Sequence, residues 1–272
     1  MAARPSRIEH EALYRAVYEF AVDTVPKEVP LGTLRVGTRV SRTVGVDFAG
    51  TLDQRAQRYQ TIPPTSSREG EYRWTGPRPD GTPGPSGGLY VALDWDAGLG
   101  EILAYHPEPD YRVSSVEAEV RAPLLTPQAL ADSFEARRTY EYELTQDLRY
   151  GDLSLGSGEF SKLLAEFDKS DGVRAALQAS GYESARLAYG ADRDYSFTRA
   201  LGHAVRGRLT RLLAIRVTSA RTEELTSFYH TGFNLVLLGT DGSTVSYLRP
   251  VLERTWQRDP AGRLRERVTV IP

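Results

Sequence analysis

The sequence predicts an α+β fold, and two observations indicate it. Short strand-like runs alternate with helical runs, but without the strict strand–helix–strand order of a parallel α/β protein. The chain also has 272 residues, of which 40% are hydrophobic, which is enough to bury one large core. We therefore expect a single sheet with helices packed against it.

The N-terminal part is expected to form a helix followed by strands. In 9–25, "EHEALYRAVYEFAVDTV", apolar residues recur at spacings of three and four, which is typical of an amphipathic helix. Pro26 and Pro30 are expected to end that helix. Residues 32–48, "GTLRVGTRVSRTVGVDF", alternate polar residues with valine and threonine, so they predict one or two strands. Three arginines here are interpreted as strand-surface charge rather than phosphate ligands: Arg35, Arg39 and Arg42.

A glycine- and proline-rich segment follows, and its role has two interpretations. Residues 76–88, "GPRPDGTPGPSGG", contain five glycines and four prolines, so neither helix nor strand is expected there. The segment is either a surface connection or a lid over a binding site. The next residues, 88–93, predict a buried strand, and 94–106 predict a short helix.

The rest of the chain is expected to alternate between helices and strands. The pattern of 194–207, "DYSFTRALGHAVRG", predicts a helix capped by Asp194 or Ser196. The other helices are expected at 126–138, 159–168 and 170–180, and the other strands at 139–145, 147–154, 210–221, 233–239 and 244–256.

Composition excludes several classes of protein. The chain has no cysteine, so disulfides, thiolate metal sites and a cysteine nucleophile are ruled out. Its four histidines lack metal-binding spacing, and "GDLSLGSGEF" at 151–160 lacks the lysine that ends a phosphate loop, so it is interpreted as a turn. There is no G-x-S-x-G elbow of a serine hydrolase. Neither a metal nor a serine nucleophile is therefore expected.

Charge and hydropathy bear on location and partners. The formal net charge of −2 gives no overall attraction to nucleic acid. A basic run at 199–221 is not expected to form a nucleic-acid surface, because it carries no recognised motif. No stretch approaches the length of a membrane span, and no signal peptide is recognisable, so a cytoplasmic protein without membrane contact is expected.

The stretch 71–106 carries the candidate site. Arg73 has a planar fork of donors that suits a diphosphate, and Trp74 and Tyr90 offer faces on which an aromatic base can stack. Taken singly, each residue has another interpretation: Arg73 as a surface ion pair, Tyr90 as core, and Glu101 as a solvated helix residue.

The order of the motifs resembles the RES-domain family. The order is Arg-aromatic-x-Gly, then Gly-Leu-Tyr-x-Ala, then Ala-x-x-x-Glu, and finally Val-x-Ser-Ala-Arg before Asn-Leu-Val-Leu, spanning about 68–240. The resemblance makes Arg73 the motif arginine, Glu101 the glutamate and Ser219 the serine, with Tyr90 eleven positions before Glu101.

The resemblance implies a fold like that of the ADP-ribosyltransferase toxins, with central mixed or antiparallel strands flanked by helices. Residues 68–272 would form the NAD-binding catalytic domain, and 1–67 an N-terminal extension packed on it. Trp74 departs from the family pattern, in which another aromatic or hydrophobic residue is usual. The extension is a second departure, which leaves the usual acceptor open.

The function implied is an enzyme that consumes NAD by cleaving the nicotinamide–ribose bond. Glu101 would offset positive charge on the ribose, Arg73 would bind the diphosphate, and Ser219 would hold the ribose or the neighbouring strand. Trp74 and Tyr90 would wall the nicotinamide pocket, and a second phosphate contact is assigned to Arg221.

Such a protein is commonly the toxin of a toxin–antitoxin pair, with a helix-turn-helix antitoxin as partner. The acceptor of the ADP-ribosyl group stays open among water, inorganic phosphate and a macromolecule. The last alternative would make the protein an ADP-ribosyltransferase. A catalytically silent module that binds NAD or another nucleotide is a further alternative.

Overall fold

The computed structural model describes residues 7–45, 74, 89–93, 132, 134–191, 195–209, 212–218, 233–238 and 246–272. The helices are α1 (Arg7–Glu28), α6 (Gly158–Lys169), α7 (Asp171–Ala179), α8 (Ala185–Ala191) and α9 (Ser196–Arg208). The strands are β1 (Leu31–Leu34), β2 (Arg39–Gly45), β3 (Leu89–Ala92), β4 (Arg137–Leu144), β5 (Leu148–Leu153), β6 (Ala214–Thr218), β7 (Phe233–Leu237), β8 (Leu248–Arg258) and β9 (Leu264–Val270).

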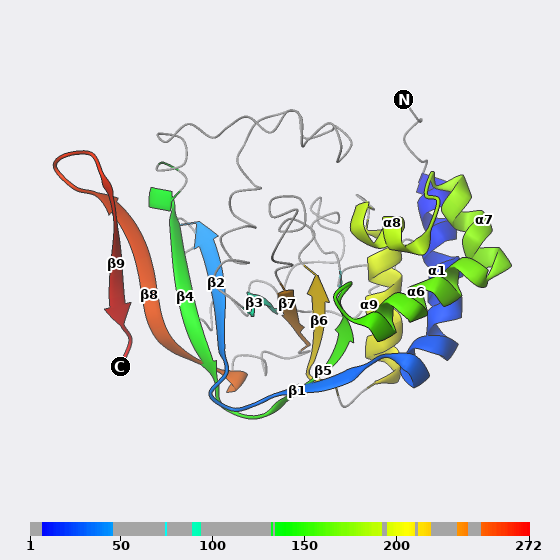
Figure 1. Ribbon diagram of the computed structural model, residues 1–272, viewed down its shortest axis with the longest axis horizontal. Coiled ribbons are helices and arrows are strands. Elements are labelled where there is room, and N and C mark those ends of the chain that lie inside the picture. The colour runs from blue at the N-terminus through cyan, green and yellow to red at the C-terminus, as the bar shows by residue number, and fades with distance from the viewer. Residues whose placement is uncertain are drawn as a thin grey trace.

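One sheet joins all nine of these strands in the order β1-β5-β6-β7-β3-β2-β4-β8-β9. Every neighbouring pair is antiparallel except β5 and β6, which run parallel. Figure 1 shows the sheet crossing the width of the view, with the β8–β9 hairpin at the left and the helices at the right. The predicted α+β class is confirmed.

The N-terminal segment takes part in the sheet. β2 lies between β3 and β4, so it occupies a central place, and β1 pairs with β5 at the sheet's edge. Helix α1 packs along α9. Residues 7–45, which fall within the predicted extension, therefore share one sheet and one helix layer with the rest of the described chain.

The two faces of the sheet have separate hydrophobic clusters. On one face, residues of β5, β6 and β7 join residues of α1, α6 and α9: Leu153, Ile215, Val217 and Val236 with Leu13, Val17, Phe160, Phe167, Leu201 and Val205. We call this the helix face. The opposite face has a smaller cluster made of strand residues: Val40, Leu89, Val91, Tyr142, Leu144, Leu148, Ala214, Leu235, Leu237 and Leu248.

Helix α1 continues past the proline that was expected to end it. Pro26 lies inside α1, which ends only at Glu28, and the amide of Val29 still donates to the carbonyl of Val25 at 2.9 Å. A proline removes one backbone hydrogen bond, whereas one whole side of α1 is buried in the core. The packing of that side outweighs the lost bond, so the expected stop at Pro26 was wrong, while the helix does end before Pro30.

Most other predicted elements are confirmed in type, and their ends differ. The helices expected at 159–168, 170–180 and 194–207 correspond to α6, α7 and α9. The helix expected to reach residue 138 is too long, because β4 already begins at Arg137. The predicted loop and lid at 76–88 and the helix at 94–106 lie outside the described residues.

The start of α9 differs from the expected cap. Ser196 is the first residue within the helix, and the N-cap is Tyr195, whose φ of 57° lies in the left-handed region. A tyrosine rarely adopts that conformation, so the helix start is held by its surroundings. The other cap candidate, Asp194, lies outside the described residues.

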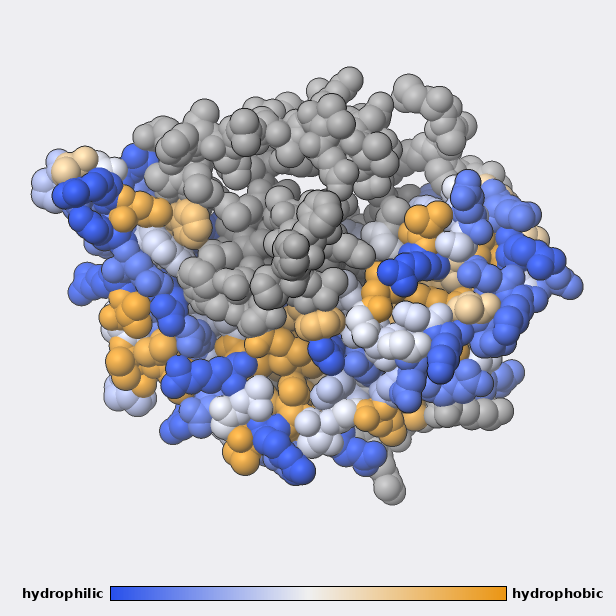
Figure 2. Space-filling view, viewed as in Figure 1, coloured by the Kyte–Doolittle hydropathy of each residue, from blue (hydrophilic) through white to orange (hydrophobic). Residues whose placement is uncertain are grey.

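The surface is mixed in character. Figure 2 shows hydrophilic residues over the helix layer at the right and hydrophobic residues scattered among charged ones elsewhere. Within the part of the chain that the structure describes, no helix is both long enough and apolar enough to cross a bilayer.

Candidate functional site

Two of the six predicted site residues are described, and they contact each other. The backbone amide of Trp74 donates to the hydroxyl of Tyr90 at 3.1 Å, although the residues are 16 positions apart. The others, Arg73, Glu101, Ser219 and Arg221, lie outside the described residues. The structure therefore brings together the arginine motif and the tyrosine motif. The contact is made by Trp74, which follows Arg73 in the sequence, and by Tyr90.

The indole of Trp74 belongs to the core. Its side chain is 1% exposed, and its ring centroid lies 5.6 Å from that of Tyr189 in α8. A ring that is this deeply buried has no face available to a ligand. The prediction that Trp74 walls a nicotinamide pocket is therefore replaced by a structural role, in which Trp74 anchors the chain next to Arg73.

The backbone of Trp74 lies directly against helix α9 at Gly202. A Cβ atom added to Gly202 would lie 2.5 Å from the carbonyl oxygen of Trp74, which is closer than real Cβ atoms approach. Only glycine at this position lets the Trp74 backbone lie against the helix. The position of Trp74 is thus set from two sides, by Gly202 and by the hydroxyl of Tyr90.

Tyr90 is held at its backbone as well as at its hydroxyl. The Arg42 guanidinium of β2 donates to the Tyr90 carbonyl at 2.5 Å, at a place where β2 and β3 share a single pair of facing residues. On α9, burial lowers the pKa of the Arg206 guanidinium from its ordinary value, and Tyr90 opposes that change. Two arginines of separate elements therefore lie close to Tyr90.

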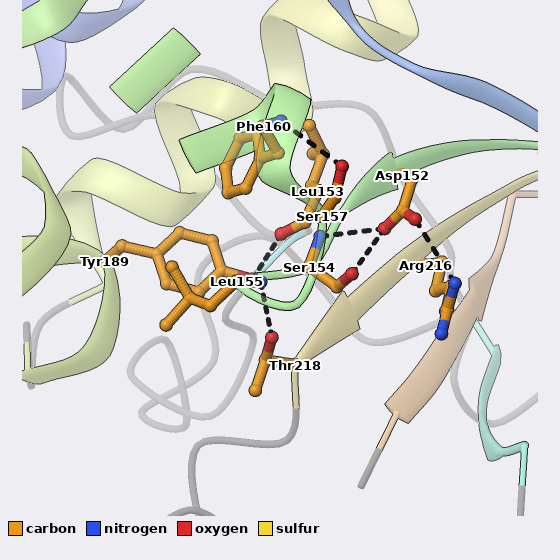
Figure 3. Close-up of polar contacts among 9 residues, drawn as sticks. All are labelled: Asp152, Leu153, Ser154, Leu155, Ser157, Phe160, Tyr189, Arg216 and Thr218. Atoms are coloured by element: carbon orange, nitrogen blue, oxygen red, sulfur yellow. Dashed lines mark hydrogen bonds and ion pairs between the residues drawn. The ribbon is translucent and has the colours of Figure 1, made fainter. Parts of the chain in front are cut away.

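A second anchor lies at the carboxyl ends of the parallel strands β5 and β6 (Figure 3). The amide of Leu155, just beyond β5, donates to the hydroxyl of Thr218 at 2.7 Å. Thr218 is the last residue of β6 and directly precedes Ser219. The chain is therefore fixed in place immediately before the predicted motif serine.

Asp152 shapes the turn that supplies this hydrogen bond. Its Oδ1 accepts from the Ser154 amide at 3.0 Å and from the Ser154 hydroxyl at 2.5 Å, and its Oδ2 faces Arg216 at 3.2 Å (Figure 3). The Arg216 guanidinium in turn lies 3.9 Å from the ring centre of Phe233, the first residue of β7. Three neighbouring strands are thus linked at one end of the sheet by charge and aromatic contacts.

A cluster of tilted aromatic rings connects the two anchors. Tyr189 packs on Trp74 and, at 5.4 Å between ring centroids, on Phe160 of α6. Its hydroxyl donates to the carbonyl of Leu153, the last residue of β5, at 2.6 Å (Figure 3). Trp74 and the end of β5, where the turn to Leu155 begins, therefore both contact Tyr189.

The helix face changes from apolar to polar across β2, β4 and β8. Residues paired directly opposite one another point to the same side of a sheet. Tyr90 packs with the helix-face residues, and side chains two positions apart on a strand point to the same side, so Ala92 also lies on the helix face. Ala92 pairs with Ser41 of β2, and Ser41 pairs with Glu141 of β4. The helix face therefore continues across β2 to β4. Thr43 and Thr139 lie on the same side, with their hydroxyls 2.7 Å apart.

Several of these polar side chains are buried. Ser41, Thr139 and Glu141 are each less than a tenth exposed. A buried sheet face is normally apolar, since a buried polar group without partners costs free energy. This part of the helix face, which we call the polar face, is therefore a candidate binding surface rather than ordinary core.

The charge of Glu141 is balanced within the polar face. Its Oε1 lies 2.5 Å from Nε and Nη2 of Arg254, whose Nη1 also contacts Glu266 at 2.9 Å. Hydrogen bonding to Glu266, the largest effect, and to Glu141 raises the pKa of Arg254. Arg39 stands 3.6 Å from the other oxygen of Glu141 and is 62% exposed. Arg39 is thus the more loosely held cation.

A groove of about 460 Å³ opens over the polar face. Its walls come from β2, β4, β8 and β9 and from the residue that follows β3: Arg39, Val40, Ser41, Leu93, Glu141, Arg254 and Glu266. The volume is within the range of small-molecule sites. Leu93 is the last described residue before the segment that contains Glu101.

Metal binding has no support in the described segments, which contain no group of three or more histidines, aspartates or glutamates arranged to hold an ion. Of the arginines interpreted from sequence as strand-surface charge, Arg35 and Arg39 do form ion pairs, with Asp147 and Glu141. Arg42 instead bonds a carbonyl within the sheet.

Sequence reasoning missed the polar face and the Asp152–Thr218 anchor. The alternation of Ser41 and Thr43 in β2, and of Thr139 and Glu141 in β4, was the available signal. That alternation predicted only strands, because the sequence does not show that their polar side lies beside the helix layer.

Comparisons with known protein families, with curated proteins and with solved structures found no match to the chain.

Proposed function

We propose that this protein cleaves the nicotinamide–ribose bond of NAD, with Glu101, Arg73 and Ser219 as the site residues. The observation that carries the proposal is the 3.1 Å hydrogen bond from the Trp74 amide to the Tyr90 hydroxyl. It joins the arginine motif to the tyrosine motif, as expected if motifs separated by a glycine- and proline-rich loop form one site.

The described ends of the strands also support one site. β3 and β6 run in the same direction, because both are antiparallel to β7, which lies between them. The carboxyl ends of β3 and β6 therefore lie at one end of the sheet, about 10 Å apart given the usual strand spacing. The chain proceeds from these ends toward Glu101 and Ser219 respectively.

The proposed chemistry breaks the bond between the anomeric carbon and the pyridinium nitrogen. Nicotinamide leaves with the bonding electron pair, which leaves oxocarbenium-like positive charge on the ribose. The Glu101 carboxylate would hydrogen-bond the ribose hydroxyls and offset that charge, while Arg73 would bind the diphosphate through two parallel hydrogen bonds. An oxygen of the acceptor then bonds to the anomeric carbon and loses its proton to solvent.

The groove over the polar face lies next to the end of β3, where it would bind the acceptor or part of the dinucleotide. Its loosely held cation, Arg39, suits an anionic group, and the Arg254–Glu141 pair supplies a rigid polar wall. A cytoplasmic toxin controlled by a helix-turn-helix antitoxin is the biological setting that the family resemblance suggests.

The test compares two glutamate variants and identifies products. Purified wild type, Glu101→Gln and Glu183→Gln are incubated with NAD, with and without inorganic phosphate, and products are resolved by mass. Glu183 is exposed, so its variant is the matched control. We expect the control to match wild type and Glu101→Gln to release nicotinamide at least about 100-fold more slowly. ADP-ribose, its 1″-phosphate or a modified protein would identify the acceptor.

An unchanged rate in a folded Glu101→Gln variant would remove this residue from the mechanism. Tight NAD binding with no nicotinamide release by wild type would favour the silent binding module instead.

A further inference from the structure

Among the described strands, β9 is the last of the sheet, and none of them pairs with its outer edge. From Arg265 to Val270 every residue of β9 is exposed, and only Leu264 is partly buried. Figure 1 shows the β8–β9 hairpin standing away from the helix layer at the far side of the sheet. An edge that is exposed on both faces is accessible to an extended segment of another chain.

The hydrogen bonds of the hairpin show which backbone groups point outward. The Ile271 amide donates to the Val251 carbonyl at 2.9 Å, and the Asp259 amide donates to the Arg263 carbonyl at 2.9 Å. In an antiparallel pair, alternate residues bond the same neighbour, so the odd-numbered residues of β9 bond β8. The amides and carbonyls of four residues therefore face outward: Leu264, Glu266, Val268 and Val270.

The two faces of this edge differ in chemistry. Val268 is 47% exposed and Val270 is 72% exposed, and both point to the side of Leu252 and Arg254, their pairing partners. The opposite side carries Arg265 and Arg267, paired with Gln257 and Thr255 of β8. An incoming strand would thus meet two valines beside Glu266 on one face and two arginines on the other.

The arginines of the hairpin outnumber the acids that pair with them. Arg263 and Arg265 share one oxygen of Asp259, at 3.3 and 3.2 Å. Arg267 has no ion-pair partner among the residues that the structure places. Pairing β9 with β9 of a second copy would bring these arginines toward one another, which is unfavourable. An acidic strand would complement them.

Charged residues also guard sheet edges against aggregation, and the first half of β9 fits that role. The second half does not. Residues 268–270, Val-Thr-Val, are β-branched, uncharged and exposed, which is the composition of a segment that pairs readily. The charges of β9 therefore lie in its N-terminal half, and its C-terminal half carries none.

We propose that β9 is a docking edge for an extended, acidic segment of a partner protein, which adds to the sheet antiparallel or parallel to β9. The segment alternates apolar side chains, which cover Val268 and Val270, with acidic side chains, which face Arg265 and Arg267. Its backbone bonds the outward groups of the even-numbered residues. The proposal does not depend on the NAD-cleaving function.

The test uses synthetic peptides and the full-length protein. A fluorescein-labelled nine-residue peptide of alternating valine and glutamate is titrated by anisotropy, next to the same peptide with lysine in place of glutamate. We expect saturable binding of the glutamate peptide and at least about tenfold weaker binding of the lysine peptide, with the difference shrinking as salt rises.

Two pairs of variants locate the binding. Val268→Pro removes one outward amide without removing a bond to β8, whereas Val268→Thr keeps that amide. Arg267→Glu reverses a charge at the edge, and Arg186→Glu makes the same change on the exposed side of α8. We expect Val268→Pro and Arg267→Glu to lower affinity at least about tenfold and the two controls to lower it less than about twofold. Unchanged thermal midpoints would show that each variant is folded.

Equal binding of both peptides, binding of neither, or unchanged affinity in Val268→Pro would overturn the proposal. Concentration-dependent dimers that Val268→Pro abolishes would assign the edge to a second copy instead.

Discussion

Replacing Gly202 by alanine tests whether the Trp74 anchor is held as described. In an ordinary helix interior, this change stabilises by about 1 kcal/mol, because alanine is the better helix former. Here the new Cβ would lie 2.5 Å from the Trp74 carbonyl oxygen, and real Cβ contacts essentially never fall below 3.0 Å. The backbone of Trp74 would have to move by about 0.5 Å, the difference between these distances.

The obstacle cannot rotate away, because it is backbone and is also bonded to Tyr90. Overpacking of this kind costs about 1–3 kcal/mol, so after the gain of about 1 kcal/mol in helix propensity we expect Gly202→Ala to lower the free energy of unfolding by up to about 2 kcal/mol. Because Trp74 adjoins Arg73, nicotinamide release should fall as well, by about tenfold or more.

The same helix provides the control. Gly207 also lies in α9, and a Cβ there meets nothing within 4 Å. Gly207→Ala should therefore leave activity unchanged and raise the free energy of unfolding by about 0.5 kcal/mol, the smaller gain expected near a helix end. Urea unfolding of both variants at 25 °C measures the difference. If Gly202→Ala stabilises as much as Gly207→Ala does, the backbone of Trp74 does not lie against α9 as described.

Three further predictions concern the second anchor, the diphosphate and the hairpin. Thr218→Val removes the acceptor of the Leu155 amide and should cost about 1–2 kcal/mol by urea unfolding, whereas Thr218→Ser should keep most of that stability; equal losses would mean that the hydroxyl does not hold the turn. Arg73→Ala should weaken NAD binding more than Arg73→Lys, measured by calorimetry, but lysine should not restore full activity because it lacks the planar fork; a fully active lysine variant would show that charge alone suffices. Hydrogen bonding from the Arg263 amide, followed by other effects, lowers the pKa of Asp259 below its ordinary value of 3.8. A carboxylate whose pKa is lower in the folded than in the unfolded protein stabilises the fold at pH above its unfolded pKa, and this stabilisation is lost as pH falls through its folded pKa. Asp259→Asn should therefore destabilise more at pH 6 than at pH 3. An equal effect at both pH values would contradict this.

Local patterns in the sequence predicted the helices of the core well. In α6 and α9 the apolar residues recur at helical spacing, and each helix buries that side, so local preference and tertiary packing agree. Helix α1 shows where the local pattern fails. Pro26 was expected to end this helix, but the helix continues to Glu28 because it packs against α9. The short helix α8 and the strand β9 were not predicted, because neither carries a strong periodic pattern.

The order of the strands could not be read from the sequence. β2 pairs with β4, about a hundred residues later, and β3 pairs with β7, about 145 residues later. Such pairings depend on long-range packing that leaves no local signal. The N-terminal segment was expected as an extension packed on the core, because the resemblance begins near residue 68, and its strand β2 lies near the middle of the sheet.

The candidate site was predictable in part. The motif order led to Tyr90 and to the Trp74 neighbourhood, and these residues do meet. What the sequence could not show is that the Trp74 indole enters the core, because aromatic rings suit both a core and a ligand pocket. The polar face was also hidden, since Glu141 becomes unusual only once it is known to be buried.

The measurement that tests the central claim most directly is the amount of nicotinamide formed from excess NAD by a small amount of purified full-length protein. Mass-resolved time courses are recorded with NAD at about 100 times the protein concentration, a ratio at which any catalytic cycle gives more than one product per protein. We predict many equivalents of nicotinamide from wild type and less than a hundredth of that rate from Glu101→Gln. No nicotinamide beyond the background of the buffer, from protein that is folded and binds NAD, would contradict the claim.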